Sequence, residues 1–237
     1  MKEYWMFGKN PCKAALENKD RVILEIRAVD TILDELNYLI PKSIKRISVK
    51  NKELDALLPN SVHQGIAIKV KPLDRLHIDW LLNSNLGLSK NIVMILDHVT
   101  DPHNIGAIIR TASAFNVRAI ITSIRNGAQE TGVVAKSAAG GLEIVPVVEV
   151  ANISEGIKIL KKHNYWVFGL DGNASENVNV MKQYDNIAIV LGSEGFGMRD
   201  LVSKNCDVLV KIPISSQMES LNVSNAAAIA LFSATSL

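Results

Sequence analysis

Short apolar runs alternate with helical patterns along the C-terminal two-thirds of the chain. The runs are rich in β-branched residues and predict strands at residues 92–97, 118–122, 145–150, 166–170, 187–191 and 208–212. Apolar residues at helical spacing predict helices at about residues 104–115, 131–139, 153–163, 198–204 and 223–235. Strands that are apolar on both faces and alternate with helices are typical of an α/β fold with a mostly parallel sheet and helices on both faces.

The first 72 residues carry a shorter and more mixed pattern. Asn10 before Pro11 has the form of an N-cap followed by proline at the first helical position, and predicts a helix over residues 11–18. Further along, the pattern predicts strands at residues 21–29, 44–49 and 66–70 and a short helix at 52–58. We therefore expect a small α/β domain over residues 1–72, a linker over 73–90 with a helix at 77–83 and a loop at 83–87, and a second domain over 91–237.

Composition is that of an ordinary globular protein, with 48% hydrophobic and 21% charged residues. No apolar run approaches the ~20 residues that a membrane span needs, and we expect neither a membrane segment nor a secretory signal. Cys12 and Cys206 lie far apart, so the sequence indicates neither a disulfide framework nor a thiolate metal site. A reducing cytoplasm is the expected setting.

Charge is distributed unevenly along the chain. Residues 1–72 hold 13 Lys and Arg against 9 Asp and Glu, a net charge of +4, whereas the remainder carries a net −2. A basic N-terminal part fits a polyanionic partner. A chance imbalance on a solvated surface explains the same numbers, so charge alone does not select a function.

Parallel sheets bind ligands at the carboxyl ends of their strands, which directs attention to the loops that follow them. The first of these segments, residues 97–115, reads DHVTDPHNIGAIIRTASAF. We expect Asn104 to cap its helix, and Ile105, Ile108, Ile109 and Ala112 to form the face that packs on the sheet. Arg110 lies off that face, and helical side chains lean toward the N-terminus, which predicts that it lies near Asn104. The alternative is a surface arginine on an amphipathic helix.

The second loop, GSEGFGM at residues 192–198, has three glycines in six residues, and these let backbone approach a ligand closely. Its spacing, G-x-x-G-x-G, differs from the dinucleotide fingerprint G-x-G-x-x-G. Glu194 would repel a phosphate and suits a ligand with hydroxyl or amine donors, or a cation. The alternative is a tight turn with a solvated glutamate.

The third loop follows the strand at 208–212, where Ser220 and Asn222 precede a helix containing Ala226, Ala227 and Ala228. Small residues allow a helix to pack closely, so an N-capped C-terminal helix explains this segment equally well. The sequence shows no cluster of His, Cys and carboxylates with metal-ligand spacing, and we expect no metal.

Three motifs in this order, NIGAIIRTASAFNV, IVLGSEGFGM and IP…SLNVSNAAAIAL, resemble the signature motifs of the SpoU-type RNA 2′-O-ribose methyltransferases of the SPOUT superfamily. The resemblance covers residues 91–237. The N-terminal block, ending HQGIAIKVKP at residues 63–72, resembles the L30e-like substrate-binding domain that precedes the catalytic domain in many members. It implies a C-terminal trefoil knot, S-adenosylmethionine as cofactor and a homodimer. The members most similar in sequence methylate a guanosine ribose in large-subunit (23S) ribosomal RNA.

The resemblance carries a set of site residues onto this chain. Those that match the catalytic positions of the three motifs are Asn104, Arg110, Glu194, Ser220 and Asn222. Cofactor contacts, largely through backbone atoms, are implied for Gly192, Ile212 and Leu221. The chain departs from the family at one point: members usually have a glycine two or three residues after the proline of the third motif, and none follows Pro213 here before Ser220.

The family assigns the role of base to the arginine that is Arg110 here, although a free guanidinium keeps its proton up to a pKa above ~12. Arg110 as a phosphate clamp that orients the ribose hydroxyl is the alternative role. Three other readings of the whole chain stand beside this one. They are a tRNA 2′-O-methyltransferase, a non-catalytic RNA-binding protein that keeps the fold, and a nucleotide-binding dehydrogenase, which the glycine spacing disfavours.

Overall fold

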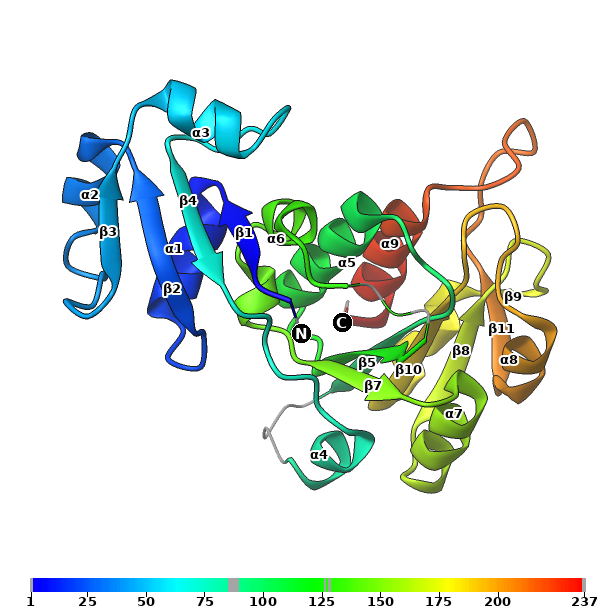
Figure 1. Ribbon diagram of the computed structural model, residues 1–237. Helices are drawn as coiled ribbons and strands as arrows, with labels where there is room; N and C mark the ends of the chain where they lie inside the picture. The colour runs from blue at the N-terminus through cyan, green and yellow to red at the C-terminus, as the bar shows by residue number, and fades with distance from the viewer. Residues whose placement is uncertain (1, 85–89, 126, 128, 236–237) are drawn as a thin grey trace. The chain divides into compact units, whose positions relative to one another are not determined.

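A computed structural model describes residues 2–84, 90–125, 127 and 129–235. The chain divides into two compact units (Figure 1). The smaller unit comprises the chain up to Asp74 together with residues 129–144, and the larger unit comprises residues 75–128 and 145–237. The chain therefore crosses between the units more than once. The predicted domain boundaries at residues 72 and 91 stay predictions, and most of the loop predicted at 83–87 lies outside the described residues.

A four-stranded sheet forms the centre of the smaller unit, in the order β1-β4-β2-β3. Its strands are β1 (Tyr4–Phe7), β2 (Ile23–Ala28), β3 (Lys45–Ser48) and β4 (Ile66–Val70). β4 pairs antiparallel with β1 and β2, and β2 pairs parallel with β3. The helices of this unit are α1 (Lys9–Glu17), α2 (Asp30–Leu36), α3 (Asn51–Leu57), α6 (Gly132–Ala138) and the short 3-10 helix η1 (Gly141–Glu143).

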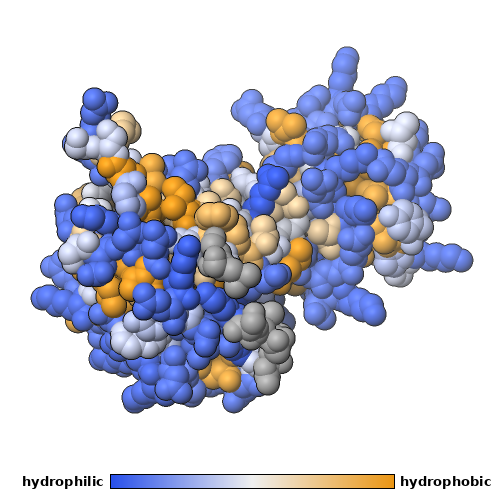
Figure 2. All heavy atoms as spheres, turned by 180° about the vertical axis from the view of Figure 1, so that it is seen from behind, coloured by the Kyte–Doolittle hydropathy of each residue, from blue (hydrophilic) through white to orange (hydrophobic). Residues whose placement is uncertain are grey.

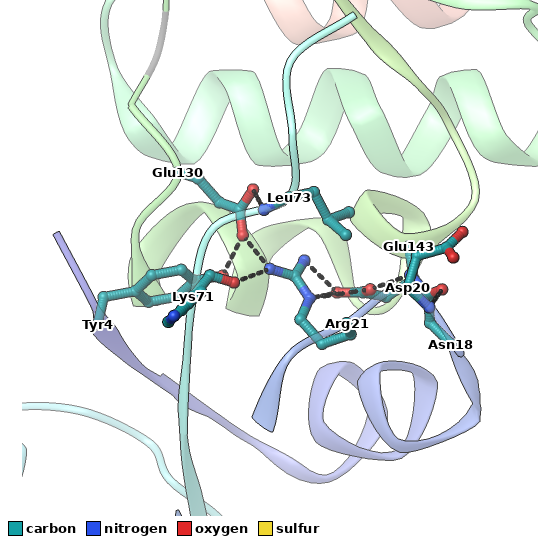
Figure 3. A network of polar contacts seen from close by, with 8 residues as sticks. All are labelled: Tyr4, Asn18, Asp20, Arg21, Lys71, Leu73, Glu130 and Glu143. Carbon is teal, nitrogen blue, oxygen red and sulfur yellow. Dashed lines mark hydrogen bonds and ion pairs between the residues drawn. The ribbon is translucent and has the colours of Figure 1, made fainter. Parts of the chain in front are cut away.

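Residues 129–144 are tied to the rest of the smaller unit by the buried guanidinium of Arg21 (Figure 3). Arg21 forms ion pairs with Glu130 and with Glu143, the latter with 2.6 Å between Nη2 and Oε1. Its Nη1 also donates to the Lys71 carbonyl at 2.9 Å, and the Tyr4 hydroxyl donates to Glu130 at 2.7 Å. A segment predicted to belong to the second domain is therefore fastened to the first 74 residues by buried charges.

The larger unit is built on a seven-stranded sheet in the order β7-β6-β5-β10-β8-β11-β9, in which every paired strand is parallel. Its strands are β5 (Asn91–Leu96), β6 (Ala119–Ser123), β7 (Val147–Val150), β8 (Trp166–Leu170), β9 (Glu176–Asn177), β10 (Asn186–Leu191) and β11 (Val208–Lys211). The prediction of an α/β fold on a parallel sheet is confirmed. The trefoil knot stays a prediction.

Helices cover both faces of this sheet (Figure 1). α5 (Pro102–Ala114) and α9 (Val223–Thr235) pack together on one face, with the 3-10 helix η2 (Val178–Gln183) against α9. α4 (Ile78–Asn83), α7 (Ile153–Lys162) and α8 (Asp200–Asn205) share a core with the other face. Alternate residues of β5 serve the two layers, which explains why the strand is apolar throughout: Val93 and Ile95 belong to the core beneath α7. Among the described residues, no helix is long and apolar enough to cross a membrane.

Two predicted N-cap residues, Asn104 and Asn10, are wrong. α5 begins at Pro102, not at Asn104, because the Asp101 carboxylate accepts from the Asn104 backbone N–H at 2.8 Å and caps the helix. α1 begins at Lys9 after Gly8, so Asn10 is already inside the first turn. Strand β1 and helix α2 were not predicted, since both are short and carry weak periodicity. The apolar face predicted for α5 is confirmed: Ile105, Ile108, Ile109 and Ala112 are buried.

Candidate active site

A cavity of about 700 Å³ opens at the carboxyl ends of β8, β10 and β11 in the larger unit. Three loops line it: the one after β8, the glycine loop after β10 and the long loop from β11 to α9. The predicted cofactor residues Gly192, Ile212 and Leu221 all lie in its wall, as does Ser220. The volume lies within the ~300–1,000 Å³ range of small-molecule sites.

Three of the predicted catalytic side chains meet beside this cavity. The Glu194 carboxylate accepts from Asn104 Nδ2 at 2.9 Å and from Asn222 Nδ2 at 2.8 Å, and the two amides are joined by a bond of 3.0 Å from Asn222 Nδ2 to Asn104 Oδ1. The Val223 backbone N–H, at the start of α9, also lies 3.5 Å from the same Glu194 oxygen. We call Asn104, Glu194 and Asn222 the polar triad.

Sheet topology brings the triad together. β5 and β10 are neighbours in register, with Leu96 opposite Leu191, so the loops that follow them begin side by side. Asn104 comes from the first turn of α5, just after the loop that follows β5, and Glu194 comes from the loop after β10, although 90 residues separate them in sequence. α9, which carries Asn222 at its entry, packs against α5 and so reaches the same point. All three sequence motifs therefore converge at the carboxyl edge of one sheet.

The glycine loop closes on itself as a small hairpin. Ser193 N–H donates to the Gly197 carbonyl at 3.0 Å, and Gly197 N–H donates to the Ser193 carbonyl at 2.9 Å. Gly195 and Gly197 have φ of +85° and +66°, values that favour glycine. At Gly192 an added Cβ would come within 2.1–2.4 Å of the Gly197 and Met198 backbone, so no side chain fits there. The glycines thus shape the loop that presents Glu194.

Asp97 fastens both ends of the glycine loop, and sequence reasoning missed it. Its backbone N–H donates to the Leu191 carbonyl at 2.8 Å, just before the loop. Its fully buried carboxylate accepts from the Arg199 backbone N–H at 3.0 Å and Nε at 2.9 Å, just after the loop. In the sequence, Asp97 is marked only as an acidic residue at the end of an otherwise apolar strand. Its role could not be read there, because its partner Arg199 lies 102 residues away.

The loop after β8 was also missed. Asp171, Gly172 and Asn173 line the cavity with the two predicted loops. Because β8 lies between β10 and β11, its carboxyl end faces the same space. The rule that ligands bind at strand ends would have selected this loop once the strand order was known. Asp171 adds a carboxylate to those of Glu194 and Glu219 in the cavity wall.

The missing glycine of the third motif has a structural explanation. The loop turns at Ser215, whose carbonyl accepts from the Met218 N–H at 3.1 Å. None of residues 213–222 has a positive φ, so the path here does not require glycine. The loop accommodates ordinary side chains while keeping Ser220 and Leu221 in the cavity wall.

Arg110 lies on the exposed side of α5, as its position off the apolar face predicts. Within the described part of the chain it forms no hydrogen bond or ion pair, and it does not line the cavity. The structure thus does not join Arg110 to the polar triad. An exposed guanidinium on the helix that follows the first loop is free to meet an anionic ligand.

Family models match both parts of the chain. Residues 91–232 match the SpoU rRNA Methylase family, and residues 5–76 match the model for RNA 2'-O ribose methyltransferase substrate binding. The first match covers more than half of the chain and contains all three loops of the site. The second match covers nearly all of the N-terminal stretch of the smaller unit, which ends at Asp74, and extends two residues beyond it.

Curated relatives extend over the full length. The chain is 38% identical over 234 residues to the 23S rRNA (guanosine-2'-O-)-methyltransferase RlmB of Escherichia coli (strain K12), covering 97% of this chain and 96% of the relative. It is 35% identical over 239 residues to the enzyme of the same name from Vibrio vulnificus (strain CMCP6), covering 99% and 97%.

Solved structures share the fold. The SpoU methyltransferase AviRb from Streptomyces viridochromogenes, in complex with the cofactor AdoMet, superposes with a TM-score of 0.81 at 21% identity, covering 98% of this chain and 89% of that one. An AdoMet-bound rRNA methyltransferase from Sinorhizobium meliloti gives 0.81 at 19% identity, covering 98% and 86%. Taken with the parallel sheet and the three converging loops, these matches establish that the chain belongs to the SpoU rRNA methylase family.

Proposed function

We propose that this protein transfers a methyl group from S-adenosylmethionine to the ribose 2′-hydroxyl of a guanosine in 23S ribosomal RNA, in the cytoplasm. The observation that carries the proposal is the polar triad at the edge of the cavity, assembled from all three motifs. The names of the full-length relatives support the choice of 23S rRNA and of guanosine.

The cavity suits S-adenosylmethionine in chemistry as well as in size. Leu170, Val210, Ile212 and Leu221 provide apolar wall for an adenine ring. The carboxylates of Asp171 and Glu194 match ribose hydroxyls and a positively charged group. At Gly172, Gly195 and Gly197 an added Cβ would meet nothing within 4 Å, so the backbone of these residues faces open space. Gly192, Ile212 and Leu221 are the residues we assign to the cofactor.

The reaction needs positioning and the removal of one proton. When bound, S-adenosylmethionine supplies a methyl group already activated on a sulfonium. Asn104 and Asn222 hold the Glu194 carboxylate in one orientation, from which it can accept a hydrogen bond from the ribose. Ser220, in the cavity wall, offers a further hydroxyl near the reacting groups. Arg110 binds the RNA phosphate or takes up the hydroxyl proton.

Arg110 provides the decisive test. Arg110→Ala should leave folding and S-adenosylmethionine affinity unchanged, since the side chain is exposed and outside the cavity. Methyl transfer to an unmodified 23S rRNA transcript should fall by about 10³-fold or more in single-turnover assays, within the range of lost general-base or electrostatic catalysis. A near-normal rate would remove Arg110 from the mechanism.

Arg110→Lys separates the two roles. Lysine keeps the charge and releases its proton more readily, but lacks the planar fork. If Arg110 acts as a base, the lysine variant should regain activity as pH rises. If it is a bidentate clamp, the variant should be as slow as Arg110→Ala at every pH. Calorimetry that detects no S-adenosylmethionine binding to the wild type would instead favour a non-catalytic RNA-binding protein.

The smaller unit supplies RNA affinity in this proposal. Residues 1–72 carry a net +4, but with Asp74 and the segment 129–144 the unit holds 14 basic and 12 acidic residues, a net +2. The exposed lysines therefore matter more than the total, and Lys42, Lys45 and Lys50 gather around β3. Changing these three to glutamine should weaken RNA binding and flatten its salt dependence by about 0.7–0.9 per lost phosphate contact.

A matched control places the same charge change on the larger unit. Lys162, Lys182 and Lys204 are exposed there and lie outside the cavity. Their glutamine variant should bind RNA with nearly the wild-type salt slope. Equal losses in both triple variants would contradict an RNA-binding role specific to the smaller unit.

We further propose that the protein works as a homodimer that covers part of α9. Seen from behind, apolar surface gathers over this helix (Figure 2), where Ile229 and Phe232 are exposed. Exposed apolar patches of this kind on soluble proteins are typical of association sites. Light scattering should give twice the mass of the chain. Ile229→Glu should shift the protein toward the monomer, and a wild-type protein that is already monomeric would overturn the proposal.

A further inference from the structure

Phe196 lies near the apex of the glycine loop and is 95% exposed, the most exposed large apolar side chain among the described residues. It stands between Gly195 and Gly197, both with positive φ, and an added Cβ at either glycine would meet nothing within 4 Å. The space beside the α-carbons of both neighbouring glycines is therefore open. Burial of a phenylalanine side chain stabilises a folded protein, and this fold leaves that stabilisation unused at Phe196.

Hydrogen bonds close the backbone of the loop that carries the ring. The reciprocal bonds between Ser193 and Gly197 close the hairpin at 3.0 and 2.9 Å. Glu194, in the same hairpin, is held by Asn104 and Asn222. The ring is therefore presented two residues from the polar triad on a closed loop.

Phe196 lies outside the cofactor cavity. Gly192, Ser193, Glu194, Gly195 and Gly197 all line that cavity, whereas Phe196 does not. Ile214 and Met218, the exposed apolar residues of the third loop, do line it. A molecule in the cavity would thus contact the loop on either side of the ring, and the ring itself is left for the second substrate.

We propose that Phe196 stacks on a nucleobase of the RNA substrate next to the target ribose, a proposal that rests on the RNA methyltransferase function above. Sequence-specific RNA recognition relies on unstacked bases laid on aromatic side chains. Its direct neighbours in sequence are two glycines, followed at two or three positions by Glu194, the partly buried Met198 and the half-exposed Arg199. A single ring in such surroundings fits a base, whose edge stays solvated, better than a protein interface, which needs contiguous apolar surface.

Substitution separates stacking from catalysis. Phe196→Ala should raise the KM for an unmodified 23S rRNA transcript by about 5- to 150-fold, the range for the loss of one base–aromatic stack. The single-turnover rate at saturating RNA should change far less, and S-adenosylmethionine affinity should stay at the wild-type value. Phe196→Trp should restore the KM, whereas Phe196→Leu, apolar but not aromatic, should not.

Leu201→Ala is the matched control, since this side chain is 62% exposed in the same unit and lies outside the cavity. It should leave the KM unchanged. An unchanged KM in Phe196→Ala, measured with a wild-type enzyme that methylates the transcript, would overturn the stacking proposal alone. A wild-type enzyme that binds the transcript but transfers no methyl group would instead overturn the proposed function.

A binding measurement tests the same contact without turnover. The tryptophan of Phe196→Trp should be quenched on titration with the transcript, after subtraction of the wild-type signal from Trp5, Trp80 and Trp166. Quenching that saturates with RNA supports stacking on a base. An emission that does not respond to RNA overturns the proposal, as does one that shifts with protein concentration alone, which would assign the ring to contact with a second copy of the chain.

Discussion

The two units contain polar networks of opposite construction. In the smaller unit, Arg21 lies between Glu130 and Glu143, and the side chains of all three are at most 4% exposed (Figure 3). In the larger unit, Glu194 is exposed, and within the described part of the chain its donors are uncharged: the amides of Asn104 and Asn222 and a backbone N–H. The Arg21 network neutralises buried charges inside the protein. The polar triad orients the Glu194 charge and leaves it accessible to a ligand.

Burial dictates the first design. A charge removed from water is costly unless it is paired and fully hydrogen-bonded. Burial opposes the charge of Arg21, yet the hydrogen bonds and charges of Glu143 and Glu130 hold its pKa above the ordinary value. Burial and the nearby Glu130 raise the pKa of the Tyr4 hydroxyl, which keeps its proton and donates to Glu130. The network is therefore suited to joining two chain segments permanently.

Exposure permits the second design. Solvent stabilises the Glu194 charge, so no cation is needed beside it. The two amides are neutral and short, and they fix the direction of the carboxylate without neutralising it. An electrostatic group held in place before the substrate arrives costs no reorganisation during the reaction. We therefore expect the Arg21 network to stabilise the fold and the polar triad to act in the reaction.

Arg21→Ala should have the largest effect. It leaves two buried carboxylates without their cation, and removing one partner of a buried pair costs about 3–5 kcal/mol of unfolding free energy. Urea denaturation should show this loss, whereas Lys9→Ala, which breaks the exposed Lys9–Glu35 pair, should cost at most about 1 kcal/mol. Equal losses in the two variants would show that the buried network does not stabilise the unit.

Glu194→Gln should give the converse result. The side chain keeps its shape but loses its charge, and methyl transfer should fall by about 10²-fold, as for the loss of one preorganised electrostatic group. Unfolding free energy should stay within about 0.5 kcal/mol, since the residue is exposed. Glu176→Gln, on β9 and outside the cavity, is the control for both readouts. A destabilised Glu194→Gln with a normal single-turnover rate would reverse the assignment.

Asp97→Asn tests a network that lies between these extremes, since its carboxylate is buried while Arg199 is half exposed. We expect a loss of about 1–3 kcal/mol in unfolding free energy, the range for a buried group left unsatisfied. Because Asp97 holds both ends of the glycine loop, S-adenosylmethionine affinity should fall as well. Destabilisation with unchanged cofactor affinity would make the contact purely structural.

Tyr4→Phe should have the smallest effect at neutral pH, about 1 kcal/mol for one hydrogen bond. The raised pKa adds a pH dependence. Above about pH 10 the unfolded chain releases the phenolic proton while the folded protein keeps it, so stability due to Tyr4 is present below pH 10 and falls by about 1.4 kcal/mol per pH unit above it. Alkaline denaturation should therefore be shallower in Tyr4→Phe, and an identical slope would contradict a buried, protonated Tyr4.

The sequence by itself determined the architecture of the larger unit. Strands buried on both faces must be apolar throughout, and helices on one side of a sheet must repeat at helical spacing, so β5, β8 and α9 were readable without coordinates. Asn104, Glu194 and Asn222 were selected through the resemblance of their segments to three family motifs, while the residues alone left a surface or capping role open for each segment. Strand and helix patterns and sequence motifs are local properties that can be recognised from consecutive residues.

Only the tertiary structure decided which of those residues meet. Strand order brings Glu194 within 2.9 Å of Asn104 across 90 residues, whereas no hydrogen bond or ion pair joins Arg110 to either residue in the described part of the chain. The tertiary structure also shows that Asp97 holds the glycine loop through Arg199. In the smaller unit it shows that Arg21 binds Glu130 and Glu143, which belong to residues 129–144. Which side chains become buried partners depends on how distant segments pack together. The free energy of such a contact depends on how far packing excludes solvent from it, and no single stretch of sequence specifies that.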